Sequence, residues 1–292
     1  MPLKQFEGLF EARLEDLARD ARAASRFVYT ELTLHHFFGS DFDVRDRIEP
    51  HAGFWNGVLA AQQAAGFIAL GRLYDQQARD HTIPGILKCA QTYAGLFCED
   101  ALRVRKQAAG MSPEQAKEFA RGTFRATAQT FEQLAKTFEP HRKVYVERVE
   151  PIRDTVFAHA GQLDRAARDE LFTKVFVREL EQMAVFPLAL HRALFHLYFN
   201  GSAPTLESPP TIVPEILRAL PGNSTNTWEH LHVVKDTARM IVWLKRAPMP
   251  EHQIDDAVLA SFMRAMELEP YGLEPEDYET QASRDDAGSG SE

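Results

Sequence analysis

Three residues near the middle of the chain, Arg153, Asp154 and His159, have side chains suited to chemistry on a phosphate. A histidine titrates near neutral pH, so it can accept a proton and return one. An arginine stays cationic and offers a planar fork of donors to a phosphate. A nearby carboxylate can hold an imidazole in one tautomer. These three residues form the candidate catalytic site, and the chemistry that they permit is independent of a metal.

The same spacing, an arginine six residues before a histidine, also occurs at Arg45 and at Arg246. Prolines interrupt both of those stretches, Pro50 in the first and Pro248 and Pro250 in the second. Both are therefore expected to lie in loops. The copy in the candidate site lies instead at the end of a long amphipathic helix, and this context distinguishes it.

The helix itself limits how the candidate site can work. Successive residues of a regular helix are about 100° apart, so the six steps from Arg153 to His159 leave the two side chains about 120° apart. One regular helix would not direct both at one phosphate. The site therefore requires His159 to lie in a frayed last turn, which Gly161 would favour, or residues from a second copy of the chain.

The elements that must position these residues are helices. Apolar residues recur at spacings of three and four from Leu3 to Leu17, which predicts a helix up to about Phe38. A polar loop is expected from Gly39 to Pro50, and Pro140 is expected to interrupt the helical pattern. Further helices are predicted at about 54–74, 83–110, 113–139, 142–158, 163–199, 213–220, 227–246 and 251–269.

No stretch predicts a strand, so the fold class is all-α. We expect an antiparallel bundle of long helices over 1–200 and a C-terminal helical extension over 201–269, divided by a loop rich in Pro and Ser. Residues 251–292 carry 12 acidic and 2 basic side chains, so the net charge of −9 lies there and the preceding residues are nearly neutral. Residues 270–292 are predicted to be a disordered acidic tail.

Cys89 and Cys98 are nine residues apart in one predicted helix, about 13 Å along its axis. At that separation they cannot form a disulfide, so two reduced thiols are expected. The amphipathic N-terminus has no secretory signal, and no stretch is long and apolar enough for a membrane span. The sequence predicts a cytoplasmic protein that does not associate with a membrane.

No metal site and no cofactor are predicted. His35 and His36 are adjacent, but no third ligand is nearby in the sequence. Glu229 and His232 have the spacing used by carboxylate-bridged di-iron bundles, which need that pair twice, and the chain contains it once. The chain also has no phosphate-binding glycine loop.

Two stretches carry a resemblance to a known family. VEPIRDTVFAHAGQLD, residues 149–164, resembles the abortive-infection HEPN-like families, in which a helix ends in Arg-Asp/Asn followed by Ala-His. FWNGVLAAQQAAGFIALGRLYD, residues 54–75, resembles their second helix with its Leu-x-Asp ending. The resemblance covers about residues 20–200 and implies a HEPN-like bundle. It also implies metal-independent RNA cleavage by Arg153, Asp154 and His159, at a site formed where two such helices meet across a homodimer.

The resemblance further implies a role in phage defence or in a toxin–antitoxin pair, with RNA as the substrate and an antitoxin or another protein as a partner. The alternative is a non-catalytic HEPN-like module that binds RNA, a nucleotide or a protein. The nearly neutral body, without an evident basic stripe, and a C-terminal third that resembles nothing familiar favour this alternative.

Overall fold

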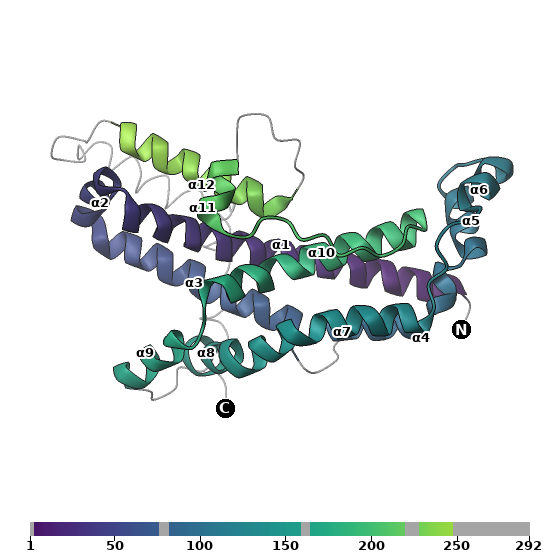
Figure 1. The fold of residues 1–292 in the computed structure, drawn as a ribbon, viewed down its shortest axis with the longest axis horizontal. Helices are drawn as coiled ribbons and strands as arrows, with labels where there is room; N and C mark the ends of the chain where they lie inside the picture. The colour runs from purple at the N-terminus through teal and green to yellow at the C-terminus, as the bar shows by residue number, and fades with distance from the viewer. Residues whose placement is uncertain (1–2, 76–81, 159–163, 220–227, 248–292) are drawn as a thin grey trace, which may run out of the picture. The chain divides into compact units, whose positions relative to one another are not determined.

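The computed structural model describes residues 3–75, 82–158, 164–219 and 228–247 of the chain. Every regular element within these residues is a helix, which confirms the all-α prediction (Figure 1). In chain order they are α1 (Leu3–Ser40), α2 (Phe42–Ile48), the 3-10 helix η1 (Glu49–His51), α3 (Ala52–Tyr74), α4 (Ile83–Thr92), the 3-10 helix η2 (Ala94–Phe97), α5 (Glu99–Ala108), α6 (Pro113–Ala120), α7 (Ala128–Val144), the π-helix η3 (Tyr145–Val149), α8 (Glu150–Ile152), the π-helix η4 (Arg153–Ala158), α9 (Arg165–Thr173), α10 (Val177–Asn200), α11 (Val213–Ala219) and α12 (Glu229–Arg246).

The long helix α1 packs lengthwise against both α3 and α10 (Figure 1). Phe38, near the end of α1, contacts Trp55, near the start of α3, with 5.4 Å between ring centroids. Phe10, near the start of α1, contacts Tyr198, near the end of α10, at 4.9 Å. Both neighbours therefore run antiparallel to α1. Each fully buried apolar side chain along these contacts stabilises the fold by roughly 1.5–3 kcal/mol.

The prediction of a loop between Gly39 and Pro50 is wrong, because α2 and η1 occupy this stretch. Asp41 is the break between α1 and α2, and its carboxylate accepts a hydrogen bond from the Val44 N–H at 3.2 Å. An aspartate in this N-cap position starts a new helix immediately. Val44 is fully buried, which holds α2 against the bundle.

The single helix predicted over 83–110 is also wrong, because α4, η2 and α5 divide it. Cys98 has extended backbone (φ −90°, ψ 164°) and is the N-cap of α5, where its Sγ accepts from the Ala101 N–H at 3.5 Å. Cys89 lies in α4, so the two cysteines do not share a helix. The separation of about 13 Å assumed a single helix through both residues, and that assumption is wrong. Neither Cys89 nor Cys98 forms a disulfide in the structure.

Pro140 does not interrupt its helix, because α7 continues through it to Val144. Proline removes one backbone hydrogen bond, but Leu134 and Phe138 in the same helix are buried and hold it in place. The break falls earlier, between α6 and α7, where Gly122 has a φ of +70°. The start of α6 at Ser112, with its capping box, is as predicted.

The segment after α10 returns along α1. The Tyr29 hydroxyl of α1 donates to the Thr211 carbonyl at 3.0 Å, and the Tyr29 ring lies 5.0 Å from that of His230 in α12. At the other end of α12, Lys245 pairs with Asp41 at 3.1 Å.

Three predictions on organisation stay open. The described residues up to Lys245 belong to one compact unit, and the domain boundaries proposed after residues 200 and 269 stay predictions. The helix predicted at 251–269 and the acidic tail lie outside the described residues. Among the described helices, none combines the length and the apolar character that crossing a membrane requires.

Candidate functional site

Arg153 and Asp154 lie in a helical run that is not regular. From Ala128 to Ala158 the chain passes through α7, η3, α8 and η4, so two π-helical segments flank the short α8. Pro151 in α8 has no N–H to donate, which removes one α-helical bond between the two segments. Because η4 is π-helical, the regular 100° step expected from the sequence does not apply after Arg153. Such π-helical segments are frequent at functional sites.

The helix α3 supports η4 from one side. Phe157 of η4 contacts Phe67 of α3, with ring centroids 5.4 Å apart. The Arg153 side chain crosses α3 at Gly71, and only 18% of it is exposed. An ideal Cβ at Gly71 would lie 2.6 Å from the Arg153 Cδ and 2.8 Å from its Nη1. The absence of a side chain at this position therefore makes room for Arg153.

The guanidinium of Arg153 is engaged on several sides. Its Nε donates to the Asp154 Oδ1 at 2.6 Å, and its Nη2 lies 2.5 Å from the same oxygen. Its Nη1 donates to the Tyr145 hydroxyl. The Glu150 Oε1 is 3.8 Å from Nη2. One cation thus faces two carboxylates and one phenol.

These contacts keep the charges in place. Burial lowers the pKa of Arg153, but the Tyr145 hydroxyl and the carboxylates of Asp154 and Glu150 raise that pKa by more, so the guanidinium stays charged. Burial raises the pKa of Tyr145 well above its usual value, so the phenol stays neutral. A phosphate that approached Arg153 in this arrangement would have to displace Asp154 or bind beside it.

His159 and Gly161 lie outside the described residues. The participation of His159 and its distance from Arg153 therefore stay predictions. Reasoning from sequence missed Tyr145 and Glu150, although both precede Arg153 within one predicted helix. Reasoning from sequence also missed Gly71. No sequence pattern links this residue to Arg153, because Gly71 lies in a different helix, α3.

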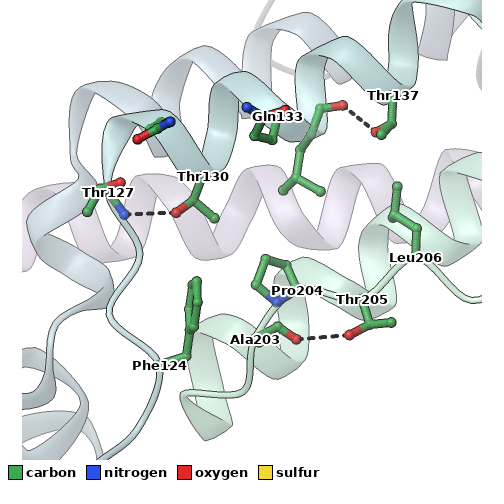
Figure 2. Close-up of a pocket in the computed structure, with 11 residues that line it drawn as sticks. Phe124, Thr127, Thr130, Gln133, Thr137, Ala203, Pro204, Thr205 and Leu206 are labelled. Carbon is green, nitrogen blue, oxygen red and sulfur yellow. Dashed lines mark hydrogen bonds between the residues drawn. The ribbon is translucent and has the colours of Figure 1, made fainter.

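A cavity of about 610 Å³ lies between α7 and residues 203–206 (Figure 2). Hydroxyl and amide groups line it, and some already bond locally: Thr130 accepts from the Thr127 N–H at 3.1 Å, and Thr137 donates to the Leu134 carbonyl at 2.7 Å. None of its lining residues is titratable. This cavity therefore offers no acid–base chemistry.

The other pairs considered from sequence are engaged elsewhere. His35 pairs with Glu31 at 3.2 Å, and the hydrogen bond to Glu31 raises the pKa of the imidazole. Glu229 pairs with Arg22 and Arg26 of α1. In the part of the chain that the structure describes, no three His, Cys, Asp or Glu side chains gather as metal ligands would.

Comparison with known families agrees with the resemblance drawn from the two stretches of sequence. Residues 4–208, more than two thirds of the chain, match the model of the HEPN family described as AbiU2. The match includes α1, α3, the run from α7 to η4, and α10. No curated protein and no solved structure matched the chain. The chain belongs to the AbiU2 family of HEPN domains.

Proposed function

We propose that this chain is a metal-independent endoribonuclease of the HEPN type that acts in phage defence or as a toxin. Arg153, Asp154 and His159 are its proposed catalytic residues. The observation that carries the proposal is the Arg153 guanidinium, held charged and largely buried in the π-helical segment that leads to His159. Membership of the family supports the same assignment.

In the proposed reaction the 2′-oxygen of a ribose attacks the adjacent phosphorus and the bond to the 5′-oxygen breaks. The products are a 2′,3′-cyclic phosphate and a 5′-hydroxyl. His159 takes the proton from the 2′-hydroxyl, and the resulting imidazolium supplies a proton to the leaving 5′-oxygen. Arg153 binds the phosphoryl oxygens as negative charge accumulates on them. Asp154 keeps the guanidinium oriented when the substrate is absent.

A homodimer is part of the proposal, because Arg153 already faces Asp154 and Glu150 within its own chain. A second copy can contribute another cation or His159 to the same phosphate. A strictly monomeric mass at micromolar concentration would count against this part. An antitoxin or another protein partner remains an expectation from the family.

Purified protein should cleave RNA in EDTA, and His159→Ala should abolish cleavage. Arg153→Lys keeps the charge but loses the planar fork, so cleavage should fall by roughly 10- to 100-fold. His51→Ala is the matched control, because His51 follows Arg45 at the same spacing and is exposed. Cleavage that needs a divalent metal, or that survives in His159→Ala, would refute the mechanism.

A second candidate function is a non-catalytic binding module. The observation that favours it is the engagement of Arg153 by Tyr145, Asp154 and Glu150, which leaves little positive charge for a substrate. In that case RNA stays intact after long incubation, and His159→Ala changes neither RNA stability nor RNA binding.

A further inference from the structure

A second polar cavity, of about 360 Å³, lies among α1, α10 and the start of α12. It shares no residue with the Arg153 site and plays no part in the proposed cleavage. Its lining combines cationic, aromatic and titratable side chains: Arg22 of α1, His191, Arg192 and Phe195 of α10, and Trp228 and Glu229.

The charges at this cavity do not balance. The carboxylate of Glu229 serves two arginines of α1, lying 3.4 Å from the Arg22 Nε and 3.2 Å from the Arg26 Nη2. Arg192 has Glu207 as its partner, at 3.5 Å. Two arginines and one carboxylate line the cavity. Counting the ion-pair partners Arg26 and Glu207, which lie outside the lining, three guanidiniums face two carboxylates, and the side chains of Arg22, Arg26 and Arg192 are 52%, 63% and 37% exposed. The excess is one positive charge, and a single negative charge on a ligand would complete the balance.

His191 adds no charge to this excess at neutral pH. Burial, together with the positive charges of Arg22 and His196, lowers the pKa of its imidazole to about 4. A neutral imidazole can donate one hydrogen bond and accept another. The cavity thus offers both an anion site and a neutral polar group.

Aromatic surface lies beside the cations. The Arg192 guanidinium carbon is 5.0 Å from the centre of the Trp228 ring, so this cation already stacks on an aromatic face. The Phe195 ring is 40% exposed, and its centroid lies 6.0 Å from that of His191. A flat π-system would find a stacking surface on Phe195 within the same cavity as the arginines.

We propose that this cavity binds a nucleoside phosphate, with the phosphate at Arg22 and Arg192 and the base against Phe195. Arginine forks suit phosphate oxygens, and base–aromatic stacking tolerates any base. The ligand is either a free mononucleotide or one nucleotide of a single-stranded RNA. Binding at this cavity is independent of cleavage at Arg153, so either proposal can fail without the other.

The test is calorimetric titration of the full chain with three probes: AMP, inorganic phosphate, and a short 2′-O-methyl oligonucleotide with a 5′-phosphate. The 2′-O-methyl groups prevent 2′-hydroxyl attack, so binding is measured without cleavage. Saturable AMP binding assigns the cavity to free nucleotides. Binding of the oligonucleotide without AMP binding assigns the cavity to RNA, provided that Arg192→Ala and Phe195→Ala weaken this binding, because the Arg153 site can also bind RNA.

Arg192→Ala and Phe195→Ala should each lower the affinity for the probe that binds by roughly tenfold. Arg239→Ala is the control, because Arg239 is an exposed arginine of α12, paired with Asp236 and absent from the cavity, and binding should not change. Glu229→Gln should tighten binding at low salt, and this gain should shrink as salt rises. A fold defect would not produce that gain.

Three results would overturn the proposal. The first is no saturable binding of AMP or the oligonucleotide at millimolar concentration. The second is equal binding of inorganic phosphate together with an unchanged affinity in Phe195→Ala, which would leave a simple anion site. The third is equally tight competition by an acidic peptide, which would indicate a protein partner instead.

Discussion

Replacing Gly71 by alanine tests whether the contact between α3 and Arg153 holds the candidate site together. The new Cβ would lie 2.6 Å from the Arg153 Cδ, closer than side-chain atoms approach one another, so the arginine must move. The backbone around Gly71 is helical and buried, so it cannot yield as easily as the side chain. Arg153 would then lose its bond to Tyr145 and part of its pairing with Asp154.

Two opposing effects set the magnitude. Loss of a largely buried, charge-assisted hydrogen bond costs roughly 1.5–3 kcal/mol. Alanine in place of glycine within a helix returns up to about 1 kcal/mol. We therefore expect Gly71→Ala to lower the free energy of unfolding by about 1–2 kcal/mol. For a unit of this size that corresponds to a drop in Tm of roughly 2–8 °C.

Gly57→Ala, in the same helix, is the matched control. Nothing lies within 4 Å of an ideal Cβ at Gly57, so this variant should be as stable as the natural protein or more stable by up to about 1 kcal/mol. Urea unfolding of both variants measures the difference. In an Arg153→Ala background the penalty at Gly71 should disappear. A Gly71→Ala variant as stable as Gly57→Ala, or a penalty that persists without Arg153, would refute the reasoning.

Three further predictions concern stability. Burial raises the pKa of Glu181 to about 7, although the carboxylate accepts a hydrogen bond from the Val213 N–H. Ionisation of this carboxyl therefore opposes folding. The free energy of unfolding is highest below pH 4.5, falls as pH rises through 7, and is lower above that pH by roughly 3 kcal/mol. Urea unfolding at pH 5 and pH 8 should show this loss in the natural protein and not in Glu181→Gln; a flat profile in both would contradict it. Tyr145→Phe keeps the ring stacked on Tyr74 but removes the acceptor for Arg153, so it should cost roughly 1–3 kcal/mol in urea unfolding, and no cost would mean that this bond contributes nothing. Ser112→Ala breaks the capping box with Gln115 and should cost about 1 kcal/mol, whereas Ser40→Ala, which alters an exposed hydroxyl at the end of α1, should have little effect.

The sequence by itself determined the class of fold and several local features, because helical periodicity and capping depend on residues a few positions apart. The apolar stripe from Leu3 to Leu17 predicted α1, and Ser112 with Gln115 predicted the start of α6. Two stretches of about twenty residues were enough to indicate the family. The errors arose where local signals compete: Asp41 begins a helix where a loop was expected, and burial around Pro140 outweighs its missing hydrogen bond.

Only the tertiary structure decided which residue of another helix lies against Arg153. Gly71 is 82 positions away in the sequence, and the close approach of its backbone follows from how α3 packs against η4. The second cavity likewise joins Arg22, Arg192 and Glu229 from three separate helices. Periodicity indicates which side of a helix is buried, but it does not indicate which residue of another helix lies against it. That pairing depends on the packing of side chains across the whole bundle, and no local pattern records it.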